Sequence, residues 1–334
     1  MKRLKRSDCS RTGITRRRAG KGFVYLDADG ERIEDEEQID HIKALAIPPA
    51  WRDVWICPYD NGHIQATGID DAGRKQYLYH EKWSLQRSMR KFDEMLDFSR
   101  RLPKLRKAVA EDLSGNEISK ERVLACAVRL MDLGFFRIGS EQYAEENSTY
   151  GVATILRSHV SLIGDDTVRF EYSAKGSQER IQDVEDPDVR KIAEAQLRRR
   201  SGPDDFLAFR DGRTWVDIRS DDINGYIQEL AGMTSSAKDF RTWNGTVLAA
   251  VELGLGEMPR SKRGRERRIR EAIEVVSGHL GNTPAVCRSS YIDPRVLDRY
   301  RNGRRIDVPN GWEVGSSPRT RATIERRVRE LIEK

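Results

Sequence analysis

The apolar periodicity of this chain changes near residue 90, and that change constrains the fold more than any other feature. Before it, short segments alternate apolar and polar residues between polar turns, as in "GFVYLDADGERI", where Asp29-Gly30 occupies the turn. After it, apolar residues recur at helical spacing. Two stripes are clear: Leu124, Ala127, Val128, Met131 and Phe135, then Ile269, Ala272, Ile273, Val276 and Leu280. The sequence predicts an α+β protein, with a small β-rich N-terminal domain (residues 1–90) and a larger, mainly α domain (residues 91–334).

One β segment interrupts the helical part. In "HVSLIGDDTVRFEYSAKGSQERIQDV", Val168, Phe170 and Tyr172 alternate with polar residues, and turn signals stand at both ends of this run. Lys175 therefore falls on the polar face of a strand, at the lip of a turn. A flexible lysine there can reach a ligand across the sheet edge, and a solvated turn lysine is the alternative.

The distribution of positive charge says more than its total. The 60 Lys and Arg residues barely exceed the 54 Asp and Glu residues among 334 positions, so the formal net charge is only +6. The basic residues gather in runs: "MKRLKR", "RRRAGK", "RSMRK", "RRR" and "RSKRGRERRIR". One such run is ordinarily a solvated helix face, but several together favour a surface that binds a polyanion.

Several classes of protein are disfavoured. The cysteines and histidines lack zinc-site or disulfide spacing. Asp27 and Asp29 fit turn chemistry better than a magnesium site. The motifs for ATP, dinucleotides, metalloproteases and serine hydrolases are absent from the sequence. No apolar run approaches the ~18 residues of a membrane span, and the charged N-terminus lacks the apolar centre of a signal peptide. We expect a cytoplasmic protein without metal, cofactor or membrane partner.

Arginines beside polar turns are the remaining candidates for chemistry. Arg137 follows an apolar helix in "LGFFRIGSEQY". In "SSAKDFRTWNGT", Lys238 and Arg241 lie in the first turns of a helix that carries Phe240, Trp243 and Val247 inward. An arginine among buried aromatics needs compensation for its charge, and a salt bridge to Asp239 is one way to supply it.

Tyr291, in "SSYIDPRVLDRY", is a core ring or a nucleophile, and base rates favour the core ring. Phosphoryl transfer to a protein hydroxyl without metal or ATP needs two guanidinium groups, a proton donor for the leaving oxygen and a further hydrogen-bond donor. Tyr291, Arg137, Arg241, Lys175 and Asn282 have these chemical types. Composition alone does not bring them together.

Four blocks of sequence join them: "FFRIGSEQYAEENSTYG", "FEYSAKGSQ", "AKDFRTWNGT" and "GNTPAVCRSSYIDPRV". In this order they resemble type IB DNA topoisomerases of the small poxvirus and bacterial branch, whose catalytic fold is shared with the tyrosine recombinases. The resemblance covers most of the chain. It implies relaxation of supercoiled double-stranded DNA without ATP, cofactor or required metal. It also implies a cytoplasmic, nucleoid-associated monomer that clamps the duplex with its N-terminal domain.

The resemblance assigns roles position by position. Arg137 and Arg241 bind the phosphate, and Lys175 is the general acid toward the leaving 5′ oxygen. Tyr291 is the nucleophile that forms a 3′-phosphotyrosyl link, and Asn282 hydrogen-bonds a nonbridging oxygen. Tyr300 is then the structural tyrosine of its segment.

Further positions are implied to contact DNA. Lys238 matches a lysine near the cleavage site, and "GRKQYLYH" resembles a segment that touches bases in the major groove, which suggests Arg74, Gln76, Tyr77 and Tyr79. One position departs from the family, because most viral and eukaryotic members carry histidine where this chain has Asn282. Asparagine donates a hydrogen bond but does not titrate near neutrality. His279, three residues upstream, remains the alternative for this role.

Two rival functions stay in view. Tyrosine recombinases share the nucleophile and the arginines, but they usually carry His-x-x-Arg where this chain has Lys238-Asp-Phe-Arg241. Their N-terminal domain is usually helical, whereas a β-rich one is predicted for this chain. The second rival is a DNA-binding protein with a decayed site, which the presence of all five catalytic residue types disfavours.

Overall fold

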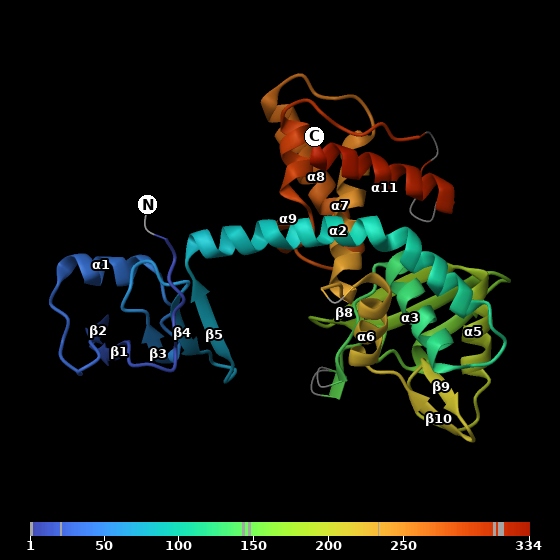
Figure 1. Cartoon of the computed structure of the whole chain (residues 1–334), viewed down its shortest axis with the longest axis horizontal. Coiled ribbons are helices and arrows are strands. Elements are labelled where there is room, and N and C mark those ends of the chain that lie inside the picture. Colours follow the sequence, from blue (N-terminus) through green and yellow to red (C-terminus); the bar gives the residue numbers. More distant parts are fainter. Residues whose placement is uncertain are drawn as a thin grey trace. The chain divides into compact units, whose positions relative to one another are not determined.

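The chain divides into two compact units, residues 1–91 and 92–334, and the boundary lies within helix α2 (Glu81–Leu113). The computed structural model (Figure 1) describes residues 3–20, 22–141, 144–145, 148–232, 234–309, 312 and 317–334. Each unit is built around its own cluster of buried apolar side chains. The α+β class predicted from the sequence is confirmed.

The first unit is a five-stranded antiparallel sheet in the order β2-β1-β3-β4-β5, with one helix. Its elements are β1 (Ile14–Ala19), β2 (Gly22–Leu26), α1 (Glu36–Ala44), β3 (Arg52–Ile56), β4 (Ile64–Ile69) and β5 (Lys75–Tyr79). The predicted turn after β2 is present, because the Asp27 carboxylate accepts the backbone N–H groups of Asp29 and Glu31, both at 2.9 Å.

Two elements of the first unit differ from the sequence reading. The run "RRRAGK" is largely strand β1, whose Arg16 lies against the Phe23 ring at 4.1 Å and donates to the carbonyl of Trp51 at 2.8 Å. Helix α1 was not predicted in a β-rich region. It begins because the Asp35 side chain accepts the N–H groups of Glu37 and Gln38.

The second unit is mainly helical. Its helices after α2 are α3 (Lys120–Gly134), α5 (Pro187–Leu197), α6 (Ser220–Ala231), α7 (Ala237–Gly254), α8 (Lys262–Leu280), α9 (Pro284–Ser290), α10 (Pro294–Arg301) and α11 (Pro318–Glu333), with a 3₁₀ turn at Arg157–His159. An antiparallel sheet has the order β6 (Val160–Ile163), β7 (Thr167–Ala174), β8 (Gln178–Glu185). The hairpin β9 (Ala208–Asp211) and β10 (Thr214–Asp217) was not predicted.

Both predicted apolar stripes are buried, with one exception at a helix end. Phe135 lies beyond the last residue of α3 in the left-handed conformation, with φ 57°, and is only half-buried. The strand prediction is also confirmed, because Val168, Phe170 and Tyr172 of β7 are buried. Lys175 is exposed in the turn that follows this strand. In the described part of the chain, no helix is long and apolar enough to cross a membrane.

Candidate active site

Residues from four distant segments line one pocket of about 300 Å³ in the second unit. They include five of the residues singled out in the sequence: Arg137, Lys175, Lys238, Arg241 and Tyr291. Arg137 follows α3, Lys175 is in the β7–β8 turn, Lys238 and Arg241 are on α7, and Tyr291 ends α9. The fold therefore gathers residues that are far apart in the sequence.

Arg241 is held by backbone carbonyls rather than by an acid. Its side chain is buried, Nη1 donates to the carbonyl of Phe135, and Nη2 donates to that of Leu280 at 2.7 Å. The salt bridge to Asp239 that the sequence left open does not form. The Asp239 carboxylate accepts from the N–H and hydroxyl of Ser236 at 2.8 and 3.0 Å, and so caps helix α7.

Arg137 fixes the orientation of Asn282. Its Nη2 donates to the Asn282 Oδ1 at 2.6 Å and to the carbonyl of Gly281 at 2.5 Å. Since arginine only donates, the amide oxygen must face Arg137 and Nδ2 is left as the remaining donor. Nδ2 is buried and has no hydrogen-bond partner among the described residues. A buried donor without an acceptor costs about 1–3 kcal/mol, so this atom is well suited to bind an incoming oxyanion.

A thiol lies close to this amide. Burial raises the pKa of Cys287, and the charges of Arg241 and Arg137 oppose that rise only in part. The thiol is therefore a neutral neighbour of the pocket.

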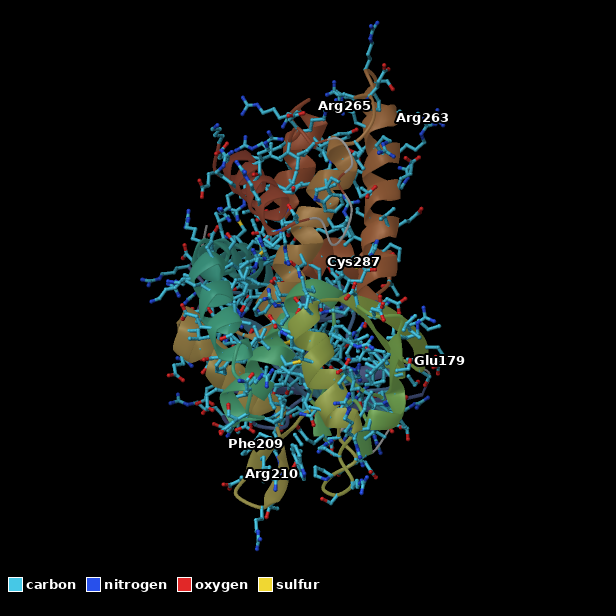
Figure 2. All side chains as sticks on the ribbon, turned by 90° about the vertical axis from the view of Figure 1, so that its right-hand side faces the viewer. Glu179, Phe209, Arg210, Arg263, Arg265 and Cys287 are labelled. Atoms are coloured by element: carbon cyan, nitrogen blue, oxygen red, sulfur yellow. The ribbon has the colours of Figure 1, made fainter. Side chains whose placement is uncertain are left out.

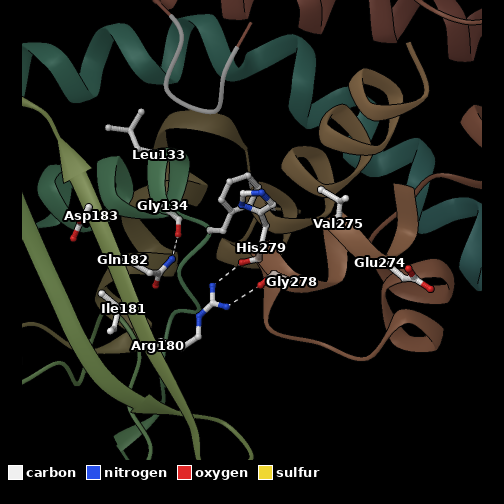
Figure 3. A pocket seen from close by; sticks show the side chains of 11 residues that line it. Leu133, Gly134, Arg180, Ile181, Gln182, Asp183, Glu274, Val275, Gly278 and His279 are labelled. Carbon is white, nitrogen blue, oxygen red and sulfur yellow. Dashed lines mark hydrogen bonds between the residues drawn. The ribbon is translucent and has the colours of Figure 1, made fainter. Parts of the chain in front are cut away.

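His279, the alternative to Asn282, lies elsewhere. Its ring packs against Phe135 with centroids 5.5 Å apart, and it lines a separate cavity of about 520 Å³ (Figure 3). Burial, and then the charge of Arg180, lowers the pKa of His279. The geometry brings Asn282, and not His279, to Arg137.

Tyr291 is half-buried and lies beside Arg241, whose Cζ is 5.2 Å from the ring centroid. Its backbone is tied to α7, because the Thr246 hydroxyl lies 3.3 Å from the Tyr291 carbonyl oxygen and accepts from the Asp293 N–H at 3.1 Å. Gly245 allows this close approach, since a Cβ there would lie 2.8 Å from the same carbonyl oxygen. Tyr300, by contrast, is fully buried, as a structural ring should be.

The pocket is strongly positive. Burial, and then the charge of Arg137, lowers the pKa of Arg241, whereas Tyr291 acts in the opposite direction. No ion pair joins either arginine to a carboxylate in the described part of the chain. An oxyanion in the pocket would relieve the repulsion between the two guanidinium groups. The phenol of Tyr291 lines the same pocket, beside Arg241. This arrangement suits attack of a hydroxyl on a phosphodiester.

The predicted DNA contacts of the first unit fall into two groups, on β5 and in the turn just before it. Tyr77 and Tyr79 are exposed and stacked, with ring centroids 6.1 Å apart. Lys75 shares their face, and its Nζ lies 5.9 Å from the Tyr77 ring. Gln76 and Arg74 both donate to the Asp70 carboxylate, at distances between 2.9 and 3.0 Å. Lys75 was not singled out in the sequence, although strand alternation could have identified it.

Other lining residues were also missed. Thr149 and Tyr150 line the same pocket as Tyr291, and they belong to the block "FFRIGSEQYAEENSTYG", in which only Arg137 was predicted to be a site residue. Gln142, Tyr143, Glu146 and Asn147 of the same block lie outside the described residues. Within the residues described, no group of three or more His, Cys, Asp or Glu side chains could hold a metal ion.

Comparisons with known proteins agree with this geometry. The family model for the catalytic core of eukaryotic DNA topoisomerase I matches residues 75–305, and the model for the N-terminal domain of bacterial DNA topoisomerase IB matches residues 22–70. DNA topoisomerase 1B of Acanthamoeba polyphaga mimivirus is 30% identical over 298 residues, which cover 87% of this chain and 88% of the viral one. The chain belongs to the type IB DNA topoisomerase family. It is therefore a DNA-acting isomerase.

More distant topoisomerases are matched in part. The vaccinia virus (strain Copenhagen) DNA topoisomerase 1B is 22% identical over 286 residues, 81% of this chain and 84% of that protein. DNA topoisomerase 1 of Schizosaccharomyces pombe is 28% identical over 169 residues, 50% of this chain but only 20% of that protein. This topoisomerase thus corresponds to nearly the whole of the viral enzymes and to a fraction of the eukaryotic one.

The basic run at residues 260–270 is not uniform in this topoisomerase. Arg265 turns back and donates to the carbonyls of Pro259 at 3.0 Å and Arg301 at 2.7 Å. Arg263, also on the first turn of α8, is exposed (Figure 2). Only part of this run is therefore available to a nucleic-acid backbone.

Proposed function

We propose that this enzyme relaxes supercoiled double-stranded DNA by transient cleavage of one strand. The Tyr291 oxygen attacks phosphorus, the phenol proton is lost, and the bond to the 5′ oxygen breaks. A 3′-phosphotyrosyl link forms, and the freed 5′ hydroxyl later reverses the step. Because that link preserves the energy of the phosphodiester, religation needs no ATP.

The observation that carries this proposal is the pair of guanidinium groups beside Tyr291, which carbonyls rather than carboxylates hold. Arg137 and Arg241 bind the nonbridging oxygens, and Asn282 donates from Nδ2. Lys175 protonates the leaving 5′ oxygen. These groups supply the positive charge that a metal ion would otherwise bring, so we propose that none is required.

DNA binding extends beyond the pocket. Lys238 contacts the backbone near the cleavage site, and Arg74, Gln76, Tyr77 and Tyr79 of the N-terminal domain contact the duplex. We propose that residues 1–90 and 91–334 act as two halves of a clamp around DNA, in a cytoplasmic, nucleoid-associated monomer.

A plasmid assay tests this function. Supercoiled plasmid is incubated with the protein at moderate salt in EDTA without nucleotide, beside a Tyr291→Phe variant. We expect relaxation and an SDS-trapped covalent adduct, both lost in the variant. Relaxation that depends on added nucleotide or metal would refute the proposed chemistry. Binding without cleavage would indicate a decayed site, and exchange only between two specific sites would indicate a recombinase.

A further inference from the structure

The C-terminal turn of α8 is capped by three arginines. Four consecutive carbonyls, those of residues 278–281, each accept a hydrogen bond from a guanidinium group. Arg241 takes the third and Arg137 the fourth, as described above. Arg180 takes the first two, donating to Gly278 at 2.9 Å and to His279 at 2.6 Å (Figure 3). Helix C-terminal carbonyls lack partners and carry partial negative charge, so they suit such a cluster.

Arg180 comes from the hairpin that carries Lys175. It lies on strand β8, and its guanidinium group also packs against Gly281, where a Cβ would lie 3.1 Å from Nη1. Gly281 has φ 58°, a left-handed conformation that ends α8 and directs the chain to Asn282. Arg180 therefore supports the turn that places Asn282 and that provides carbonyls to Arg137 and Arg241.

A second side chain on the same face of β8 strengthens this link. Gln182 donates from Nε2 to the carbonyl of Gly134, the last residue of α3 (Figure 3). It also accepts from the Tyr172 hydroxyl at 2.8 Å. Because the Gly134 carbonyl can only accept, the amide nitrogen of Gln182 must face it and the amide oxygen is left to accept from Tyr172. Strand β8 thus holds the ends of the two helices that precede Arg137 and Asn282.

No carboxylate accounts for the placement of Arg180. No ion pair of this arginine occurs in the described part of the chain, and its guanidinium hydrogen bonds go to the end of α8. Burial lowers the pKa of Arg180, Tyr172 opposes this, and Arg137 adds to the lowering. A half-buried arginine near two others is unfavourable unless the helix end compensates for it.

We infer that Arg180 is a positioning residue for strand cleavage, holding the α8 turn so that Arg137, Arg241 and Asn282 meet the phosphate in the correct geometry. This inference rests on the proposed function. It predicts a defect in binding the transition state at phosphorus, and not in proton transfer to the leaving group. A displacement of about 1 Å in such a site costs roughly 100-fold in rate.

The test is single-turnover cleavage by the full chain, measured as SDS-trapped adduct. The substrates are duplexes with either an oxygen or a sulfur as the 5′ leaving atom. For Arg180→Met we expect a rate constant lowered roughly 10- to 100-fold on both substrates, with full amplitude and unchanged duplex affinity. Lys175→Ala, in contrast, should be slow only with oxygen, because a thiolate leaves without protonation.

Two further measurements distinguish a positioning role of Arg180 from a role in folding. Arg169→Gln removes an arginine of the same hairpin whose pair with Asp183 is solvent-exposed, and it should cleave normally. In Arg180→Ala, added guanidinium ion should restore part of the rate, since the vacated site borders the cavity of about 520 Å³.

Each other outcome has a defined meaning. A lower amplitude at an unchanged rate constant would show that Arg180 only stabilises the fold, and recovery on the sulfur substrate would show that it acts through Lys175. Either result, or a wild-type rate, overturns the inference. Absence of any adduct from the wild-type enzyme would instead refute the proposed function.

Discussion

In the larger unit, Arg137 and Arg241 are held by backbone carbonyls at a helix end, whereas in the smaller unit Tyr77 and Tyr79 lie exposed on edge strand β5. The arginines are therefore in place before a phosphate arrives, and their geometry depends on the packing of several helices. The tyrosines depend on little beyond their own strand. Substitutions should accordingly have large, distributed effects in the larger unit and small, local effects in the smaller one.

The helices of the larger unit are joined by a cluster of charged side chains around two buried carboxylates. The described residues of the smaller unit contain no such cluster. Asp132 of α3 and Glu325 of α11 are both buried, and Arg106 of α2 donates to both carboxylates at 2.8 to 2.9 Å. Arg321 donates to Asp132 at 2.6 Å and to the Asn244 side chain of α7 at 3.2 Å. The cluster thus joins the helices that lead to Arg137 and carry Arg241.

The largest expected effect is on the stability of the larger unit. Asp132→Asn leaves two half-buried arginines with one buried carboxylate, and breaking such an arrangement costs about 3–5 kcal/mol of unfolding free energy. Hydrogen exchange should accelerate in α3 and α11 while strands β1 to β5 keep their rates. Asp97→Asn, which breaks an exposed pair with Arg100 on α2, should change little. Equal acceleration in the β1 to β5 strands would mean that the two units unfold as one.

The same cluster makes a prediction for pH. Burial alone would raise the pKa of Asp132, but Arg321 and Arg106 outweigh it and lower the pKa from 3.8 to about 2. A carboxyl with a depressed pKa stabilises the fold above its unfolded pKa, and this contribution is lost as the pH falls through the folded pKa. The stability difference between wild type and Asp132→Asn should therefore shrink between pH 3.8 and about pH 2. A difference that stays constant over that range would contradict this account.

Sequence reasoning reached five of the residues that line the pocket, and the reason is chemical. Arg137, Lys175, Arg241 and Tyr291 belong to short blocks that resemble a known family, so their convergence was predicted although their separate roles remain proposals. Arg180 was not predicted, because the residues next to it in the sequence do not distinguish it from other arginines on strands. Its partners, the carbonyls at the end of α8, lie 98 and 99 residues away. Tertiary contacts of this kind leave no periodic signal.

On β5, by contrast, the sequence contained a signal that was not used. Arg74, Gln76, Tyr77 and Tyr79 were grouped as DNA contacts because they adjoin one another in sequence. Strand alternation separates Gln76 from the two tyrosines, and Asp70 binds Gln76 and Arg74. That division follows from period-two geometry and could have been predicted. Helix α1 could also have been predicted, since Asp35 followed by two glutamates is a helix start signal.

An intermediate effect is expected at Thr246, which ties the backbone of the candidate nucleophile to α7. Thr246→Val keeps the shape but leaves the buried Asp293 N–H without an acceptor, at a cost of about 1–3 kcal/mol. If Tyr291 shifts as a result, single-turnover cleavage should slow roughly 10- to 100-fold. Thr242→Val is the matched control, because that buried hydroxyl bonds only within α7, to the Lys238 carbonyl at 3.0 Å. Equal rates for the two variants would remove Thr246 from the positioning network.

The smallest effect should come from the exposed face of β5, and it sharpens the contrast between the units. Tyr77→Ala should weaken duplex binding by about 1 kcal/mol or less and leave cleavage at saturating DNA unchanged, because Tyr77 belongs to the smaller unit and the residues that line the pocket belong to the larger one. Lys75→Ala should reduce the slope of log affinity against log salt by about 0.9, the value for one lost phosphate contact.

Two controls fit these variants. Tyr59→Ala removes another exposed tyrosine of the same unit, with Lys5 4.6 Å from its ring, and should have no effect on binding. Gln76→Ala should weaken binding less than Tyr77→Ala, because Gln76 must first leave Asp70 to reach DNA. The reverse order, measured by fluorescence anisotropy across a salt series, would assign the DNA-facing side of β5 to Asp70 and its partners. A slower cleavage step in Tyr77→Ala at saturating DNA would show that the smaller unit also takes part in arranging the active site.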